Sequence, residues 1–295
     1  MDLLEIWAQK TREIEQTLEN VLPPEETKPG ILHQSMRYST LNGGKRLRGF
    51  LVCAAAELFG GNRQAALELA AAMEMIHAYS LIHDDLPCMD NDDLRRGRPT
   101  NHKVFGEAIA LLAGDALITH AFLVLSNLTR LSVPGEKVLN IIKEIAEACG
   151  TGGMIGGQTE DICAEGKEIA IEDLRLIHRL KTGALIRAAV RTGALLGRVT
   201  EVELAAVTVY GEKIGLAFQI TDDILNETGT PDILGKPIKS DQERRKATYP
   251  SFFGLERSKE LAVMEINGAH EAIKILGEKA RILHELADYI FERNK

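Results

Sequence analysis

A long apolar segment that ends abruptly in acidic residues constrains this chain more than any other feature of its sequence. Residues 63–85 have the composition of a buried helix, which at 1.5 Å per residue would span roughly 35 Å. The ten residues from Asp84 to Asp93 then contain five aspartates. Two unit charges about 4 Å apart interact by roughly 4 kcal/mol at a dielectric near 20, so crowded carboxylates favour a cation between them. We therefore expect a central helix with a cation-binding end.

The rest of the chain is helical in pattern as well. Tyr249 marks the point from which helix resumes near the C-terminus, after a polar segment (229–246) that we expect to be a loop. We find no alternating strand pattern, low-complexity tract or repeat. Long helices that are apolar around much of their circumference predict an all-α bundle, one domain over residues 1–295. The other expected helices cover residues 3–22, 45–59, 103–128, 137–149, 154–164, 171–196 and 201–226.

Charge and hydropathy exclude two classes of partner. A net charge of −8 and a pI near 5.6 argue against nucleic acid, because binding a phosphate backbone needs a basic surface. No stretch of 18 or more apolar residues is free of charge, and the nearest candidate (104–125) contains Glu107, Asp115 and His120. We therefore expect no membrane span.

The cysteines and the N-terminus indicate the cellular compartment. The first residues lack the basic-then-apolar order of a signal peptide. The cysteines form neither a CxxC motif nor a Cys/His metal pattern, and we expect reduced, mostly buried thiols in a cytoplasmic protein. These cysteines are Cys53, Cys88, Cys149 and Cys163.

A second polar stripe lies far downstream in another apolar helical segment. Gln219, Asp222, Asp223 and Asn226 share one helical face, which needs partners if it is buried and none if it is exposed. The first acidic run by itself would also suit a solvated loop. It does not fit an EF-hand, because Leu94 falls where an oxygen ligand is needed. Oxygen-only ligands suit Mg²⁺, which readily bridges carboxylates and phosphates.

Clusters of cations complete the pattern. Residues 43–48 read Gly-Gly-Lys-Arg-Leu-Arg, a flexible turn before a helix start, and such a start with cations is an anion site. Any one of these cations would more often be a surface charge. Two acidic clusters together with them predict a site that holds divalent metals and a polyphosphate. Further cations that can contribute are Arg95, Arg96, Lys181 and Lys236.

Seven ordered motifs resemble those of the trans-prenyltransferases, the trans-polyprenyl diphosphate synthase family, and most closely its bacterial farnesyl diphosphate synthases (geranyltranstransferases). The resemblance covers most of the chain and implies an all-α bundle of about ten core helices around a deep central cavity, usually as a homodimer. The motifs are GGKRLR (43–48), HDDLPCMDNDDLRRGRPTNH (83–102), AGDAL (113–117), GGQTED (156–161), KTGAL (181–185), FQITDDILN (218–226) and LGK (234–236).

The resemblance also implies roles for individual residues. Asp84 and Asp90 would bind two Mg²⁺ ions with support from Asp85 and Gln158, and Asp222 would bind a third. Arg95, Lys181 and Lys236 would hold the diphosphate of the allylic substrate. Thr182, Gln219 and the ring of Phe218 would line the carbocation region. The diphosphate of isopentenyl diphosphate would be held by Gly44, Lys45, Arg48, His77 and Arg96.

The activity implied is the Mg²⁺-dependent head-to-tail condensation of isopentenyl diphosphate with dimethylallyl and geranyl diphosphate to give farnesyl diphosphate. Tyr79, five residues before Asp84 and so about 7.5 Å deeper along the helix, would close the hydrocarbon pocket together with Ser80. A tyrosine at this position also suits an ordinary core. One departure is Asn226, where the family generally has aspartate, and we expect it to weaken metal binding.

Three other functions remain open. A synthase of geranylgeranyl diphosphate or longer chains would share the chemistry and differ in the pocket floor. A non-catalytic subunit of a heteromeric synthase typically lacks the aspartate motifs, which are intact here. A terpene cyclase would leave Lys45, Arg48 and His77 without a purpose.

Overall fold

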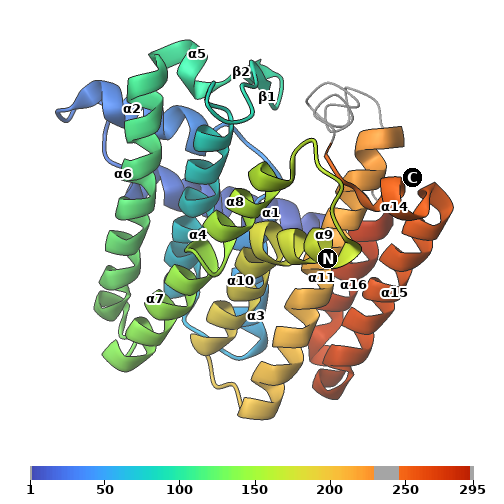
Figure 1. Ribbon diagram of the computed structural model, residues 1–295. Helices are drawn as coiled ribbons and strands as arrows, with labels where there is room; N and C mark the ends of the chain where they lie inside the picture. Colours follow the sequence, from blue (N-terminus) through green and yellow to red (C-terminus); the bar gives the residue numbers. More distant parts are fainter. Residues whose placement is uncertain (1, 229–245, 293–295) are drawn as a thin grey trace.

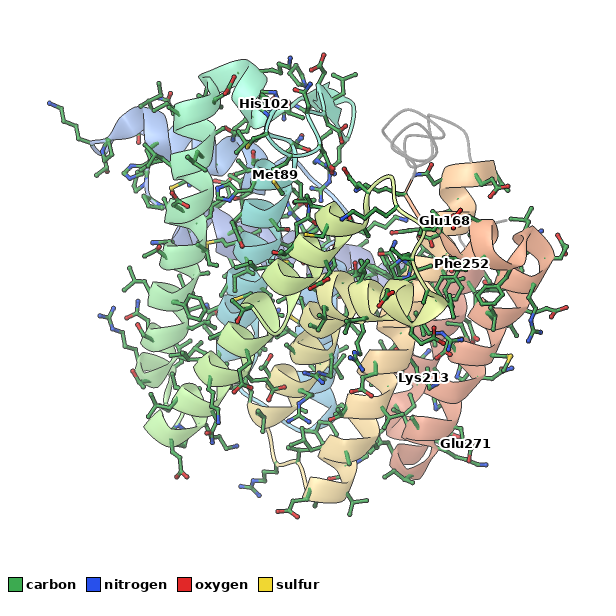
Figure 2. The ribbon with its side chains drawn as sticks, viewed as in Figure 1. Met89, His102, Glu168, Lys213, Phe252 and Glu271 are labelled. Atoms are coloured by element: carbon green, nitrogen blue, oxygen red, sulfur yellow. The ribbon has the colours of Figure 1, made fainter. Side chains whose placement is uncertain are left out.

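The structure is a computed structural model that describes residues 2–228 and 246–292. This part of the chain is an all-α bundle, as predicted, with one two-stranded hairpin (Figure 1). Charged side chains such as Glu271 project from the outer helices (Figure 2). The main helices are α1 (Leu3–Val21), α2 (Gly30–Thr40), α3 (Leu47–Leu58), α4 (Arg63–Asp84), α5 (Asn101–Phe105), α6 (Glu107–Ser126), α7 (Gly135–Cys149), α8 (Met154–Ala164), α9 (Ile171–His178), α10 (Ala184–Leu195), α11 (Glu201–Thr228), α14 (Tyr249–Phe253), α15 (Leu255–Ile273) and α16 (Arg281–Glu292).

Helix α4 lies in the middle of the bundle and confirms the helix predicted over 63–85. Asn62 caps its start, because the side-chain oxygen accepts a hydrogen bond of 3.0 Å from the Ala65 amide. Alanines on several sides of the helix are buried and allow α1, α3 and α6 to approach closely. The helix ends at Asp84, and Asp85 is its C-cap residue. The first acidic motif therefore begins where the core of the bundle ends.

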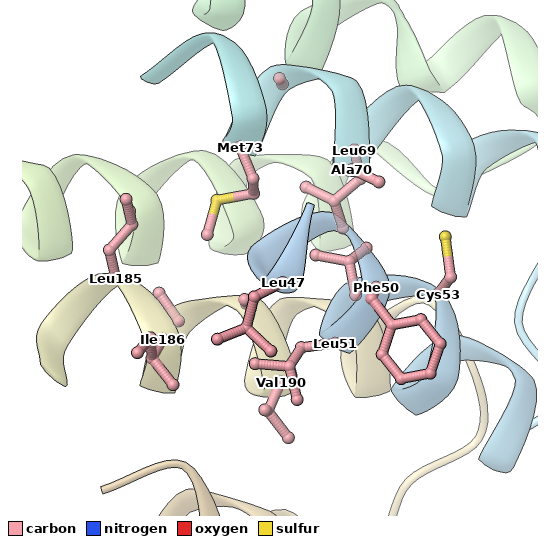
Figure 3. Close-up of a cluster of buried hydrophobic side chains, with 14 of the residues drawn as sticks. Leu47, Phe50, Leu51, Cys53, Leu69, Ala70, Met73, Leu185, Ile186 and Val190 are labelled. Atoms are coloured by element: carbon pink, nitrogen blue, oxygen red, sulfur yellow. The ribbon is translucent and has the colours of Figure 1, made fainter. Parts of the chain in front are cut away.

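Part of the main hydrophobic core lies between α3, α4 and α10. Figure 3 shows Phe50 in this cluster, with Leu47 and Leu51 of α3 between Met73 of α4 and Val190 of α10. Phe50 also stacks on Trp7 of α1, with ring centroids 4.8 Å apart. Burial of a large apolar side chain contributes about 1.5–3 kcal/mol, so this cluster fixes the helices that carry the polar motifs.

Two apolar helical stretches of the described chain are long and apolar enough to cross a membrane by length and composition alone. These are Arg63–Asp84 and Glu107–Leu131. Within the first, 78% of the apolar window is buried in the bundle, so its hydropathy is that of a core helix. Within the second, 39% is buried, and Leu111, Leu112 and Leu123 remain exposed on α6. Two such stretches are weak evidence for a membrane span, and the exposed side of α6 equally suits a protein partner.

Several predicted element boundaries were wrong. The helix expected over 103–128 breaks at Gly106, whose φ of 83° ends α5 before α6 begins. The helix expected over 171–196 contains a π-helical turn at Arg179–Gly183 (η2). The sequence analysis also missed α2 and the hairpin of β1 (Leu94–Arg95) and β2 (Arg98–Pro99). Two smaller elements, η1 (Asn127–Leu131) and η3 (Lys274–Ala280), are 3₁₀ helices.

Two further expectations need correction. Helix α3 begins at Leu47, so only Arg48 of the three cations in residues 45–48 is helical, and Lys45 and Arg46 precede the helix. The cysteines are free, but only Cys53 and Cys149 are buried, whereas Cys88 and Cys163 are exposed. The predicted loop over 229–246 lies outside the described residues except for Lys246.

Candidate active site

A cavity of about 1490 Å³ opens at the end of α4 where the first aspartate motif begins. Met89 of that motif, labelled in Figure 2, is part of its wall. The cavity brings together nearly all the residues that the sequence analysis singled out. Lys236 lies outside the described residues, and Asp85 is buried beside the cavity without lining it. The predicted residues that line it are Gly44, Lys45, Arg48, His77, Tyr79, Ser80, Asp84, Asp90, Arg95, Arg96, Gln158, Lys181, Thr182, Phe218, Gln219, Asp222, Asp223 and Asn226.

The two aspartates at the end of α4 have different surroundings. Burial raises the pKa of Asp84 to about 6, with Lys181 opposing the rise and Asp90 adding to it. Burial also raises the pKa of Asp85, but Arg95 counters it by donating its Nε hydrogen to both carboxylate oxygens, at 2.8 and 3.0 Å. The Asp90 amide donates to the Asp84 carbonyl at 2.8 Å and folds the loop back over the helix end. Asp84 and Asp90 therefore face the cavity, while Asp85 anchors Arg95.

The second acidic motif divides in the same way. Asp223 is buried, and its two oxygens accept hydrogen bonds from Gln219 Nε2 at 3.0 Å and from the Tyr249 amide at 2.9 Å. Gln219 in turn accepts a hydrogen bond of 2.9 Å from the Thr182 hydroxyl. Asp223 thus ties α11 to α14 and orients Gln219, which leaves Asp222 as the carboxylate of this pair placed for a ligand.

A buried histidine that the sequence analysis missed supports this network. His178 Nε2 lies 3.8 Å from Asp223 Oδ2, and the imidazole stacks on Tyr249 with ring centroids 5.5 Å apart. Burial lowers the pKa of His178 to about 3, so the ring is neutral at physiological pH. Its place three residues before Lys181 was the only sequence signal for it.

The donor set fits Mg²⁺ but forms no closed cage. Among the residues that the structure describes, no three His, Cys, Asp or Glu side chains converge as a ready-made metal site. Mg²⁺ is usually held by one or two carboxylates together with waters and substrate phosphates, so a closed cage is not required. The raised pKa of Asp84, caused by burial and by Asp90, marks a place where a cation would relieve the crowding of negative charge.

A second part of the cavity has an excess of positive charge. Burial lowers the pKa of Arg48, and Glu74 and Asp222 only partly offset it. The pKa of His77 lies well below its usual range because the ring is buried and Arg48 and Arg96 lie near it. Burial and the neighbouring arginines likewise lower the pKa of Arg96. An anion bound here would relieve this repulsion, as expected of a diphosphate site.

The glycine turn before α3 shapes this positive region. A Cβ atom on Gly44 would lie 2.5 Å from the Arg96 guanidinium, so glycine allows the arginine to fold over the turn. Arg96 also donates a hydrogen bond to the Gly43 carbonyl. Arg46, in contrast, is a structural residue, since it is buried, donates to the Thr40 carbonyl at 2.8 Å and pairs with Glu74 at 3.7 Å.

Two lysines of the cavity, Lys181 and Lys246, meet at an aspartate to which the sequence analysis gave no role. Asp161 Oδ2 accepts a hydrogen bond of 2.7 Å from Lys181 and one of 3.1 Å from Lys246. Lys246 also lies 3.6 Å from Asp90 and 3.3 Å from Glu165. The signal for Asp161 was its place one helical turn after Gln158 in the same motif, whereas Lys246 stood in a polar segment without any pattern.

A π-helical turn and a glycine place Lys181. The turn η2 carries Lys181 and Thr182 toward the cavity, and π-turns often occur at functional sites. Helix α8 crosses it so closely that a Cβ atom on Gly157 would lie 2.2 Å from the Lys181 amide nitrogen. The spacing between Asp161 and Lys181 therefore depends on glycine at 157.

The apolar end of the cavity contains the residues predicted to limit product length. Tyr79 is 8% exposed, and burial raises the pKa of its hydroxyl to about 12. Its ring meets the His83 ring edge-on, with centroids 5.2 Å apart. The Ser80 hydroxyl donates to the His77 carbonyl at 2.9 Å and so stays within the helix surface. Tyr79 is thus a bulky, neutral group at the position expected for a pocket floor.

Comparison with known proteins gives a consistent result. Residues 29–283 match the model of the polyprenyl synthetase family. The chain is 50% identical to the farnesyl diphosphate synthase of Escherichia coli (strain K12), over 89% of each chain. It is 45% identical to a geranylgeranyl diphosphate synthase of Cyanophora paradoxa, over 95% of this chain and 93% of that protein. The apo crystal structure of an FPP/GFPP synthase from Zymomonas mobilis, 38% identical, superposes with a TM-score of 0.88 over 98% of both chains.

Proposed function

The chain belongs to the polyprenyl synthetase family and is a prenyltransferase of the trans-prenyl diphosphate synthase class, and on that premise we propose that it makes farnesyl diphosphate. Isopentenyl diphosphate would condense head to tail with dimethylallyl diphosphate and then with geranyl diphosphate. The observation that carries the proposal is one cavity with carboxylates at two facing motifs, a buried cationic region and a tyrosine at its apolar end.

Each substrate would meet a different set of side chains. The buried excess of positive charge around Arg48, His77 and Arg96 suits the diphosphate of isopentenyl diphosphate, with Lys45 and the Gly44 turn beside it. The allylic diphosphate would lie between the two aspartate motifs, where Lys181 and Arg95 supply positive charge and Lys236 is expected to add to it. Arginine suits such sites because its planar fork matches phosphate oxygens.

The chemistry requires that the allylic carbon–oxygen bond ionises and leaves a carbocation beside inorganic diphosphate. Three bound Mg²⁺ ions, held by Asp84, Asp90 and Asp222, would neutralise the charge that develops on the departing diphosphate. Thr182, Gln219 and Phe218 line the same cavity, and hydroxyl and amide oxygens and an aromatic ring would suit a carbocation. The alkene of isopentenyl diphosphate then attacks, and the released diphosphate takes the proton.

Product length is the finer part of the proposal. The relatives include both farnesyl and geranylgeranyl diphosphate synthases, so family membership leaves the length open. A buried Tyr79 on the cavity wall, with Ser80 beside it, favours the C15 product because it ends the apolar space early. Geranylgeranyl diphosphate is the alternative, and it requires the growing chain to pass Tyr79.

We also propose that the enzyme acts in the cytoplasm as a homodimer. Helix α6 supports the dimer because it is strongly apolar, yet only 39% of its most apolar stretch is buried. Leu112 and Leu123 lie on the exposed side, 51% and 53% exposed. A second copy of the chain would cover this face.

The test is a product assay with the purified protein. It is incubated with Mg²⁺, isopentenyl diphosphate and dimethylallyl diphosphate, and the products are dephosphorylated and sized, with EDTA and the Asp84→Ala variant as controls. Metal-dependent farnesol as the main product supports the proposal. Geranylgeraniol as the main product would retain the chemistry and overturn the C15 assignment. No product under any of these conditions would favour a non-catalytic subunit.

A further inference from the structure

His83 precedes the aspartate pair on α4 and rests against the backbone of α6. A Cβ atom on Gly114 of α6 would lie 2.2 Å from His83 Nε2, so the ring occupies the space that any other residue at 114 would fill. The same nitrogen lies 2.9 Å from the Leu111 carbonyl oxygen, which accepts its hydrogen in the corresponding tautomer. The Asp115 carboxylate lies 3.9 Å away.

The His83 ring also meets the ring of Tyr79, the residue proposed as the pocket floor. Tyr79 is one helical turn earlier, and its ring meets the imidazole at 84° with centroids 5.2 Å apart. His83, Tyr79 and Leu111 all line the cavity. Tyr79 cannot turn toward α6 while the imidazole fills that space, because protein interiors are closely packed.

We propose that His83, seated on Gly114, is a specificity-determining residue that holds the Tyr79 ring in place and so sets the length of the prenyl product. This inference rests on the proposed function, since it concerns the hydrocarbon pocket of a prenyl diphosphate synthase. His83 acts through Tyr79 and is therefore a positioning residue.

The packing predicts opposite effects on the depth of the hydrocarbon pocket for substitutions of His83 and of Gly114. His83→Ala leaves a space beside Tyr79 into which the phenol ring can turn, and this deepens the pocket. Gly114→Ala places a methyl group where the imidazole lies and pushes the ring off α6 toward the cavity, which narrows the pocket. In the His83→Ala/Gly114→Ala double variant the methyl group meets no ring, so the Gly114→Ala effect should disappear.

The experiment compares product distributions of wild type and variants at equal conversion, with isopentenyl diphosphate and geranyl diphosphate as substrates. We expect His83→Ala to raise the ratio of C20 to C15 product roughly tenfold or more, the scale on which a pocket discriminates added methylene groups. Gly114→Ala should lower that ratio, and the double variant should match His83→Ala. His83→Gln, which keeps bulk and a donor to the Leu111 carbonyl, should shift the ratio least.

Asp115→Asn is the matched control, because it removes the nearby charge and preserves the volume around His83. Asp115→Asn should leave the ratio of C20 to C15 product unchanged. A cooperative thermal unfolding transition for each variant confirms that the variant is folded. Unchanged ratios in folded His83→Ala and Gly114→Ala would overturn the inference, as would a shift in Asp115→Asn equal to that of His83→Ala. Ratios are read relative to wild type, so a wild type that makes mainly C20 product would overturn the C15 proposal while leaving this test valid.

Discussion

At the level of single residues, the two members of each aspartate pair serve different purposes. Asp84, Asp222 and Asp223 line the cavity. Asp223 also accepts hydrogen bonds from Gln219 and the Tyr249 amide, and Asp85, which lies beside the cavity, holds Arg95. The motifs alone predicted that these pairs belong to one site. The resemblance implied metal-binding roles for Asp84 and Asp222, but the contacts that hold their neighbours could not be predicted. The contact of Asp223 with the Tyr249 amide joins segments that are far apart in the sequence.

The raised pKa of Asp84 predicts a conflict between stability and activity. A carboxyl whose pKa rises from 3.8 to about 6 on folding binds its proton more tightly in the folded state, so metal-free stability falls as pH rises from about 4 to 6. Asp84→Asn removes this penalty and should stabilise the metal-free protein at pH 7 by about 1–3 kcal/mol, while abolishing turnover. Thermal unfolding at pH 4 and pH 7 in EDTA measures the effect.

The control for that substitution is Asp93→Asn, since Asp93 is exposed and pairs with Lys103 at 2.7 Å. It should not stabilise the protein at pH 7. A metal-free Asp84→Asn variant that is no more stable than wild type at pH 7, or equally stabilised at pH 4, would contradict the electrostatic explanation.

Asp161 yields a prediction about ligand rescue. It neutralises two lysines at once, and its side chain is only 16% exposed, so Asp161→Asn leaves two ammonium groups without their shared carboxylate. We expect the metal-free variant to lose about 1–3 kcal/mol of stability. Inorganic pyrophosphate with Mg²⁺ should then raise the melting temperature more in the variant than in wild type, because its oxygens replace the missing carboxylate.

Differential scanning fluorimetry with and without pyrophosphate measures this difference. Asp173→Asn, an exposed substitution in the first turn of α9, provides the comparison. If pyrophosphate stabilised Asp161→Asn less than it stabilises wild type, Asp161 would be needed to position the lysines rather than to neutralise them in the empty site.

At the level of elements, the sequence predicted helices where apolar residues repeat at helical spacing. It did not predict the breaks and turns that depend on local backbone geometry. The helix over 63–84 was clear from its composition, and its end was marked by charge. The break at Gly106 was not, because the glycine stands within an apolar pattern that continues on both sides of it. The π-turn at Arg179–Gly183 was also missed, and α8 and α11, which lie outside that segment, pack closely against the turn.

This close crossing predicts the effect of a single methyl group. Gly157→Ala would place a Cβ atom 2.2 Å from the Lys181 amide nitrogen, so α8 and the π-turn must separate. Because small misplacement of catalytic groups is costly, we expect kcat to fall about 100-fold, with a smaller loss of stability of about 1–3 kcal/mol. Steady-state kinetics and thermal unfolding separate the two effects. Gly135→Ala, at a glycine with open space around it, should change neither, and an unaltered kcat in Gly157→Ala would argue against this account of Lys181.

At the level of the whole molecule, the exposed face of α6 links the fold to assembly. Leu111, Leu112 and Leu123 are all exposed on α6, although the apolar stretch of α4, its neighbour, is mostly buried. Charge on this face should therefore separate the subunits while leaving each fold intact. We expect wild type to sediment as a dimer and the Leu112→Glu/Leu123→Glu variant as a monomer with the same helical content by circular dichroism.

Val202→Glu supplies the comparison for assembly, because Val202 is 68% exposed and lies at the start of α11 rather than on α6. It should remain dimeric, since a charge outside the interface opposes no contact between subunits. A monomeric wild type would show that α6 covers no second copy. If wild type bound lipid vesicles and Leu112→Glu/Leu123→Glu abolished that binding, the same face would be assigned to a membrane surface.

Because Leu111 lies both on this face and in the cavity wall, the dimer is also expected to seal the apolar end of the site. The monomeric variant should then show a broader distribution of product lengths than the dimer.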